Sequence, residues 1–528
     1  MMLRRFLVSL ALLSTACRGD PLGGQAAQPS TRHVTILFAA DLHAQLEEHD
    51  ELFWHGEERI ERAGGFARLA KAIRQIRAER GGAVLAIDGG DTIQGSAAAA
   101  WTEGRAVVPA LNAVGFDLGI PGNWEVVYGP GTLRARAAEI RHPLVAANLH
   151  DAVTGERLFS PWVIREVGGV RIGVIGYTDP DVPLRQPPAY SEGLAYRGPE
   201  ELSALAAEVR EAGAEVVLLV SHIGLARALA LTEEVEGIDV HLSSDTHERT
   251  YTPIDRKGVW VVEPGAFGSF LGRLDLWVRE GEIVDRRWEL VELTARRFDE
   301  DEEVKAIVEQ SLAPLRDRLD RPVGRTEVPL TRYSVLETNL DNFLADALRA
   351  VAGTDIALSN GFRFGTPTGP GTLHEEDLWT FYPISTPLLV GEVTGAQLLA
   401  FWEQEIENAL SPDYRKRFGG WLPRPSGMTV RFEAEAPYGR RVREIRVHGE
   451  PLDPARTYTV AACLREGDAP DTLCRIRGAK NVRRLEIDAH EAVRRFLARN
   501  PFVRPQLEGR VVAEDLPRVL RSQIRELF

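Results

Sequence analysis

Five short clusters of Asp, His and Asn residues in the first half of the chain could bind metal ions. In chain order they are Asp41-Leu-His43, Gly89-Gly-Asp91, Gly122-Asn123, Ser221-His222 and Asp245-Thr-His247. Oxygen and nitrogen ligands without a thiolate suit Mn, Fe or Zn in a hydrolytic site. Two such ions about 3.5–4 Å apart, bridged by a shared carboxylate, can generate hydroxide at neutral pH and hold both the attacking and the leaving oxygen. The clusters therefore predict metal-assisted hydrolysis.

Taken one at a time, these clusters have plainer explanations. An Asp-x-His sequence is often a turn beside a surface histidine, Gly-Gly-Asp is a common turn, and Ser-His after a strand can be a hydrogen-bonded cap. The metal site is favoured because all five clusters share one placement, directly after a predicted strand. Loops at the carboxyl ends of strands meet in one crevice of an α/β sheet, so residues distant in sequence can face one another there.

The elements that must position the clusters are short β-branched runs that alternate with amphipathic helical stretches. The runs are residues 34–38, 84–87, 170–175, 216–220 and 238–242, and the clearest helical stretches are 64–80 and 199–212. Runs that are apolar throughout are typical of strands covered on both faces. The alternation predicts a layered α/β domain.

The chain is long enough for more than one domain. Its 528 residues, 44% of them hydrophobic, can bury at least two cores. A charged segment with helical spacing at 296–324 predicts a linker helix. It separates a first domain at 33–295 from a second α/β domain at 325–525.

The N-terminus is typical of an export signal at residues 1–20, followed by a tether at 21–32 rich in Gly, Pro, Gln and Ser. The apolar run between Phe6 and Leu13 is too short to span a bilayer. The sequence Leu-Ser-Thr-Ala-Cys, which ends at Cys17, resembles the bacterial lipoprotein box. We therefore expect a periplasmic or membrane-attached exported protein whose only membrane anchor is a lipid on Cys17. Plain cleavage after the signal is the alternative.

Two further cysteines, Cys463 and Cys474, stand ten intervening residues apart. In an oxidising compartment a structural disulfide between them is favoured. Two free buried thiols are the alternative.

The net charge of −14 disfavours nucleic acid and acidic membranes as partners. A small anionic substrate needs local positive charge or a metal ion to offset this field. Both the charge and the clusters thus predict a metal-dependent enzyme for a small anion.

The motifs "DLH", "GGDTIQGS", "GNWE", "SHIG" and "DTH", in this order, resemble the calcineurin-like metallophosphoesterase family. Through "ALSNGFR", "TFYPISTPLLVGEVTGAQLL" and "GMTVRF", the second domain resembles the 5'-nucleotidase C-terminal domain. The resemblance implies a four-layer α/β/β/α sandwich, a linker helix and a second α/β domain. It also implies two divalent ions, expected to be manganese, with Asp91 as the bridge. One ion would be held by Asp41, His43, Asp91 and His247, and the other by Asp91, Asn123, His222 and Asp245.

The chain departs from this family pattern at two places. The family's substrate dyad begins with the His of Gly-Asn-His-Glu and ends with an Asp three residues later, where this chain has Trp124 and Val127. Neither side chain can exchange a proton near pH 7, so the usual general acid is absent. Trp124 instead offers an apolar wall beside Asn123. Asp245 stands where the family has the first His of Gly-His-Thr-His, which favours a hard ion such as manganese or marks a weakened second site.

The second domain carries the residues expected to bind the substrate. Asn360 and Arg363 match positions that hold the anionic group in the wider family, and an arginine can pair two oxygens at once. Nucleotidases stack the base between two aromatic side chains. Ala462, six residues before Asp468, replaces one of them, and Phe418 is the candidate for the other. The missing half of the clamp costs roughly 1–3 kcal/mol of stacking.

A narrower resemblance accounts for these departures. Gly-Asn-Trp-Glu and the stretches 411–433 and 465–478 resemble the SoxB thiosulfohydrolases of bacterial sulfur oxidation. This implies attack of a metal-bound hydroxide on a cysteine-bound thiosulfonate of a sulfur-carrier protein, with release of sulfate. The sulfur leaving group is weakly basic and needs little protonation. Asp91, Asn123 and Trp124 are then the catalytic candidates. A 5'-nucleotidase or other small phosphoester hydrolase is one alternative, and a non-catalytic relative that binds a metal or a carrier is the other.

Overall fold

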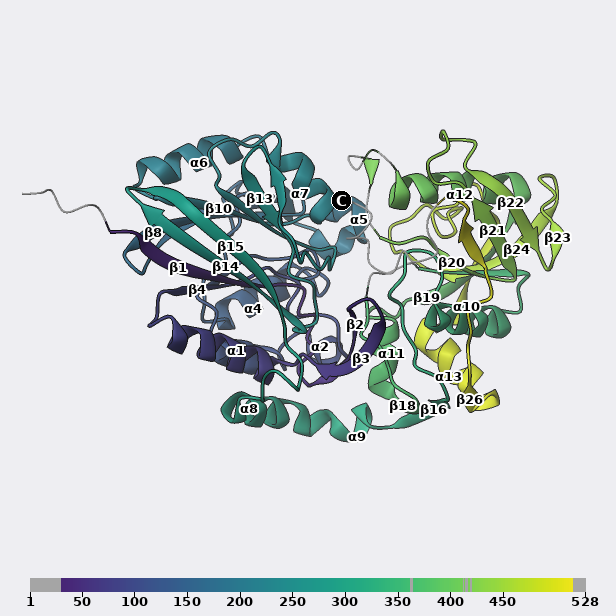
Figure 1. Cartoon of the computed structure of the whole chain (residues 1–528). Coiled ribbons are helices and arrows are strands. Elements are labelled where there is room, and N and C mark those ends of the chain that lie inside the picture. Colours follow the sequence, from purple (N-terminus) through teal and green to yellow (C-terminus); the bar gives the residue numbers. More distant parts are fainter. Residues whose placement is uncertain (1–29, 361–363, 412, 414–415, 418–419, 516–528) are drawn as a thin grey trace, which may run out of the picture.

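The computed structural model describes residues 30–515, apart from 361–363, 412, 414–415 and 418–419. Two α/β domains lie side by side, and a helical segment that runs along the first domain joins them (Figure 1). The export signal, Cys17, Arg363 and Phe418 lie outside the described residues. Among the residues that are described, no helix is long and apolar enough to cross a membrane.

Two β-sheets form the centre of the first domain. The first sheet has the order β15 (Glu282–Glu292), β14 (Phe270–Arg279), β1 (Arg32–Ala39), β4 (Val84–Asp88) and β5 (Leu118–Gly119). The second has the order β12 (Ile254–Arg256), β13 (Val259–Val262), β11 (Val240–Ser244), β10 (Val216–His222), β8 (Val170–Thr178) and β7 (Trp162–Val167). Strands β1, β4 and β5 are parallel, and so are β8, β10, β11 and β13. Each parallel set therefore brings its carboxyl ends to one edge of its sheet.

Alternation of side chains along the strands builds the layers. On β1, Ile36 and Phe38 pack between the two sheets, whereas Leu37 and Ala39 pack against helices on the other face. The helices that cover the first sheet are α1 (Phe66–Glu79), α3 (Val108–Val114) and α8 (Glu302–Leu312). Those that cover the second are α6 (Leu202–Glu211) and α7 (Leu225–Thr232). The predicted α/β/β/α sandwich is confirmed, and both β4 and β10 are buried along their whole length.

The chain passes from α8 through α9 (Arg316–Leu319) into the second α/β domain. Its central sheet has the order β20 (Arg424–Ser426), β17 (Ile356–Ser359), β24 (Thr457–Cys463), β19 (Pro387–Thr394) and β25 (Lys480–Asp488). Helices α10 (Asn339–Ala352) and α13 (Ala489–Arg499) pack on one face of this sheet. On the other face lie α12 (Gly395–Leu410) and the strands β21 (Met428–Phe432) and β22 (Val442–Val447).

Cys463 and Cys474 are free thiols, so the disulfide favoured by the sequence is not formed. Cys463 packs against the core under α10 and α13, whereas Cys474 packs against the core under α12. Burial raises the pKa of Cys463 to about 12 and that of Cys474 to about 11, so both groups stay protonated. Cys474 adds to the effect of burial on the pKa of Cys463, so the two thiols lie near each other without being bonded.

Candidate metal centre

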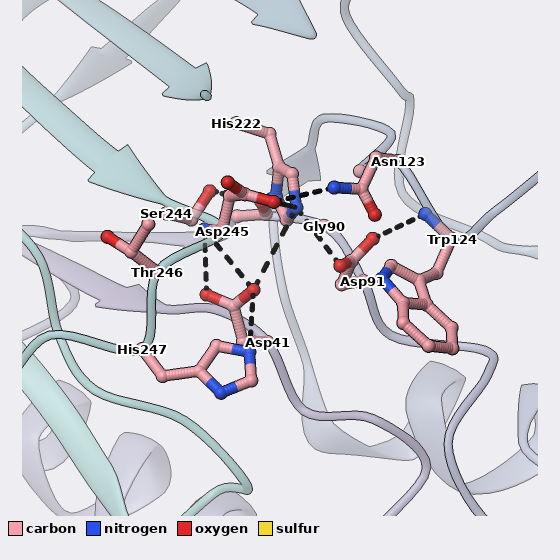
Figure 2. Close-up of polar contacts among 12 residues, drawn as sticks. Asp41, Gly90, Asp91, Asn123, Trp124, His222, Ser244, Asp245, Thr246 and His247 are labelled. Carbon is pink, nitrogen blue, oxygen red and sulfur yellow. Dashed lines mark hydrogen bonds and ion pairs between the residues drawn. The ribbon is translucent and has the colours of Figure 1, made fainter. Parts of the chain in front are cut away.

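The seven predicted ligands meet at the carboxyl edge of the two facing sheets. Figure 2 shows the part of the cluster around Asp41, Asp91 and His222. The loops after β1, β4 and β5 supply four of the seven ligands, the last residue of β10 supplies one, and the loop after β11 supplies two. They are Asp41, His43, Asp91, Asn123, His222, Asp245 and His247. Their side chains are almost completely buried. The edges of both sheets of the predicted sandwich thus form this site.

Two groups of possible ligands share one carboxylate. Asp41, His43 and His247 form the first group, and Asp41, Asp91 and His222 form the second. In the first group, His43 Nε2 lies 3.0 Å from His247 Nε2, which lies 3.6 Å from Asp41 Oδ1. In the second, His222 Nε2 lies 3.1 Å from Asp91 Oδ2 and 3.8 Å from Asp41 Oδ1. Asp91 Oδ2 also lies 3.9 Å from His43 Nε2, so both Asp41 and Asp91 stand between the two groups.

The tautomers of two histidines test whether a cation fits this cluster. His43 Nδ1 lies 3.1 Å from Gln94 O, and His222 Nδ1 lies 2.8 Å from Gly89 O. Because a carbonyl only accepts, both Nδ1 atoms carry hydrogen. Burial lowers the pKa of His43 to about 4, so the ring is neutral near pH 7. Its Nε2 therefore carries a lone pair, which faces His247. Nitrogen lone pairs and carboxylate oxygens that face one another need a cation between them.

The charge on His222 leads to the same conclusion. Its Nε2 is buried and has no hydrogen bond of normal geometry, although Asp91 Oδ2 is close. Burial opposes a charged imidazole, but Asp91, Asp41 and Asp245 outweigh burial and raise the pKa of His222 well above its ordinary value. Burial also raises the pKa of Asp41. The cluster thus favours positive charge at its centre, and its donor set fits divalent cations.

The comparisons with known proteins agree with this geometry. The family model for calcineurin-like phosphoesterases matches residues 34–249, and that for the 5'-nucleotidase C-terminal domain matches residues 322–463. The chain thus combines a calcineurin-like phosphoesterase domain with a 5'-nucleotidase C-terminal domain. It is a metal-dependent hydrolase.

Individual relatives and structures extend over nearly the whole chain. The snake venom 5'-nucleotidase of Naja atra is 27% identical over 91% of this chain and 98% of its own length. UshA of Escherichia coli is 23% identical over 86% of this chain and 88% of its own length. Sulfate thiohydrolase SoxB of Thermus thermophilus has a TM-score of 0.83 at 28% identity and covers 92% of this chain and 97% of its own. A 5'-nucleotidase precursor, also of Thermus thermophilus, has a TM-score of 0.79 at 24% identity and covers 92% of this chain and 100% of its own.

The loops of the phosphoesterase domain hold its ligands in strained backbone conformations. Asp41, His43, Asp91, Asp245 and His247 all have a positive φ, between 46° and 92°. Side chains other than glycine rarely adopt such angles, and this strain is typical of functional sites. The loops also approach closely, because a Cβ on Gly122 would lie 2.1 Å from Asp91 Oδ1.

Glu125 is a residue of this site that sequence reasoning did not assign. Its carboxylate accepts hydrogen bonds from the backbone N–H groups of Asp91 (3.0 Å), Thr92 (2.7 Å) and Gly122 (2.6 Å). Burial, with Asp91 adding to it, raises the pKa of Glu125 to about 7. Glu125 thus ties the loop that carries Asp91 to the loop that carries Asn123. Its place in the Gly-Asn-Trp-Glu motif was the only signal for it in the sequence.

Trp124 acts on the phosphoesterase site through both its backbone and its ring. Its N–H donates to Asp91 Oδ1 at 2.8 Å. Its indole meets the edge of His43, with the ring centres 5.8 Å apart, and stacks at 6.0 Å on Phe364 of the nucleotidase domain. Phe364 also lies 4.8 Å from His43 and 5.6 Å from Phe267. Sequence reasoning missed Phe364 and Phe267, which complete an aromatic wall around His43.

A small pocket lies between the two domains beside this wall. Its lining residues are His247, Phe267, Arg332, Tyr333, Phe364, Gly365 and Trp421. Tyr333 donates its hydroxyl hydrogen to the backbone oxygen of His247 at 3.3 Å. The nucleotidase domain therefore closes one side of the metal centre.

The predicted substrate residues that are described lie in the nucleotidase domain. Asn360 is half-buried at the end of β17, and Arg332 donates to its backbone oxygen at 2.9 Å. Asp468 forms an ion pair with Arg465 at 2.6 Å. Ala462 is fully buried in the core of the sheet, so this position offers a substrate no stacking surface.

Proposed function

We propose that this protein is an exported hydrolase with two manganese ions that releases sulfate from a thiosulfonate bound to a cysteine of a sulfur-carrier protein. The observation that carries the proposal is the place of Trp124. Its indole, which cannot exchange a proton, lies against His43 and Phe364 next to the ligand Asn123. The likeness to SoxB of Thermus thermophilus supports the same reading.

The proposed reaction suits a site without a general acid. Hydrolysis breaks the sulfur–sulfur bond to the sulfonate, transfers the water oxygen to that sulfonate and releases sulfate, two protons and a cysteine persulfide anion. Bound divalent ions supply a nucleophile at neutral pH and offset the charge of the anion. Because the persulfide is a weakly basic leaving group, Trp124 and Val127 need not donate a proton to it.

The position of Ala462 also disfavours a nucleotide. Its side chain is fully buried, so this position offers nothing for a base to stack on. An extended cysteine arm that ends in a sulfonate needs no such stacking surface.

The proposed compartment follows from the sequence of the N-terminus. A signal at residues 1–20 and a lipid on Cys17 would place the enzyme in the periplasm or on the outer face of a membrane. A carrier protein with a cysteine arm would meet it there.

A 5'-nucleotidase is the second candidate function. The match to the Naja atra enzyme extends over most of both chains. The cluster of possible metal ligands also suits hydrolysis of a phosphoester. The buried Ala462 and the indole of Trp124 are the observations that rank it second.

A parallel assay separates the two candidates. Manganese-loaded protein is incubated with cysteine S-thiosulfonate and, separately, with a nucleoside monophosphate, and sulfate and phosphate are measured. We expect sulfate release that greatly exceeds phosphate release. Nucleotide turnover without sulfate release would establish the second candidate instead.

Restoring a proton donor should raise phosphoester hydrolysis. We expect Trp124→His combined with Val127→Asp to increase nucleotide hydrolysis by about a hundredfold, since general acid catalysis contributes about 10²–10⁴-fold. The increase should be smaller for p-nitrophenyl phosphate, whose leaving group needs no proton. Val127→Asp alone is the matched control. An unchanged rate in the double variant would show that the pocket, and not the missing dyad, sets the specificity.

A further inference from the structure

An arginine outside the predicted ligand set contacts Asp245. Arg185 ends α5 (Val182–Arg185), which lies on the side of the first domain that faces the second (Figure 1). Both terminal nitrogens of Arg185 lie 3.4 Å from Asp245 Oδ2. The other oxygen, Oδ1, accepts a hydrogen bond from Asn123 Nδ2 at 2.5 Å and lies 3.9 Å from His222 Nε2. One oxygen of Asp245 therefore faces the arginine, and the other faces the metal centre.

The charge of the site explains why this contact matters. Asp245 is the third buried carboxylate of the cluster, after Asp41 and Asp91. A buried carboxylate is costly unless a positive charge compensates it. Because Arg185 supplies positive charge beside it, Asp245 adds less negative charge to the metal centre than an unpaired aspartate would.

Arg185 is itself held in place by a second aspartate, Asp179. It forms an ion pair with Asp179, which is fully buried, and Arg227 binds the other oxygen of Asp179 at 2.8 Å. Arg227 also pairs with Asp181 at 2.8 Å. Asp179 thus directs the guanidinium of Arg185 toward Asp245.

The segment that carries Arg185 is fastened on two further sides. Gln186 Nε2 donates to the backbone oxygen of Asn123 at 2.7 Å. From the second domain, Arg465 donates to the backbone oxygens of Leu184 (2.7 Å) and Gln186 (2.8 Å). The residues on either side of Arg185 are therefore bound by the other domain.

We propose that Arg185 is a positioning residue for one of the two metal ions: it offsets the negative charge of Asp245 and turns Asp245 Oδ1 toward His222, so that Asp245 serves as a ligand. The inference rests on the two-ion centre of the proposed function. It does not depend on the substrate, because Arg185 acts on the ligand and not on the ester that is cleaved.

Manganese binding to the full chain tests this role without any assay of activity. Metal-free wild-type, Arg185→Gln, Arg185→Lys and Arg227→Gln proteins are titrated with Mn²⁺ by calorimetry, and bound metal is counted after dialysis. We expect Arg185→Gln to lower the affinity for one ion by about 10–100-fold, the usual effect of losing a group that orients a ligand. The affinity for the other ion should be unchanged. Arg185→Lys should lose less, because it keeps the charge without the two-pronged geometry.

Arg227→Gln is the matched control. Like Arg185, Arg227 pairs with Asp179, but its second partner is Asp181 and not Asp245. The Arg227→Gln variant should bind both ions as the wild type does. If Arg185→Gln bound each of the two ions with the same affinity as Arg227→Gln does, the proposal would be overturned.

A double variant keeps the test decisive if Arg185→Gln does not fold. Asp245→His alone should bind one ion weakly, because Arg185 then lies beside that ion with Asp179 as its only remaining carboxylate partner among the described residues. Asp245→His with Arg185→Gln should recover much of that loss, because a neutral ligand needs no counter-charge. Equal affinities in these two variants would overturn the proposal, and so would a wild-type protein that binds no divalent ion. Manganese binding that depends on Arg185 in a protein without sulfate release would refute the proposed substrate alone.

Discussion

Asp91→Asn should lower kcat/KM by about a thousandfold on whichever substrate the wild type hydrolyses. Asp91 Oδ2 faces His222 at 3.1 Å and His43 at 3.9 Å, and its Oδ1 accepts from the backbone N–H of Trp124. An amide has nearly the same shape but carries no negative charge to share between two ions. A bound ion contributes several kcal/mol to catalysis, and each 1.36 kcal/mol is about tenfold in rate. Steady-state kinetics and counting of bound manganese measure both effects.

The control for this variant is Asp255→Asn. Asp255 lies on β12 with 55% of its side chain exposed and pairs with Arg286 at 3.5 Å. This change should leave both the rate and the metal content unaltered. If Asp91→Asn kept two ions and wild-type kinetics, Asp91 would not be the bridge, and Asp41, which belongs to both ligand groups, would be the remaining carboxylate for that role.

Removal of the metal should abolish activity and lower the melting temperature by roughly 10 °C. An ion present at a thousandfold its Kd stabilises the folded state by about 4 kcal/mol, and a domain of this size loses roughly 2–4 °C for each kcal/mol. Without cations, the buried Asp41, Asp91 and Asp245 repel one another, and burial with this repulsion raises the pKa of Asp41. Dialysis against a chelator, followed by calorimetry and an activity assay, measures the change. Manganese should restore both properties.

The Asp91→Asn variant is the internal control for chelation, because it has less bound metal to lose and should show a smaller fall in melting temperature. A chelated wild-type protein that kept its activity and its melting temperature would contradict the assignment of the cluster as a metal centre.

The ligand clusters could be found in the sequence because each is a local feature. A buried strand is an apolar run that can be recognised within a few residues, and the loop that follows it must lie at the carboxyl edge of the sheet. Asp41 after β1 and Asp91 after β4 are placed in this way. The linker and the second α/β domain were also visible, since they depend on charge and periodicity along the chain.

Other features depend on contacts between parts of the chain that no local pattern connects. Phe364 reaches His43 only because the second domain packs over the first, and Arg185 meets Asp245 only because α5 lies beside the loop after β11. The two cysteines remain free thiols, although their spacing in the sequence allows a disulfide.

The sequence by itself therefore determined which residues can hold metal ions and which sheet edges carry them, because strand periodicity fixes where each loop begins. Only the tertiary structure decided how the two sheets face each other, which aromatic wall encloses His43 and which cation balances Asp245. These depend on packing between elements, where side chains far apart in sequence settle into contact because burying apolar surface and pairing buried charge both lower the free energy of the folded chain.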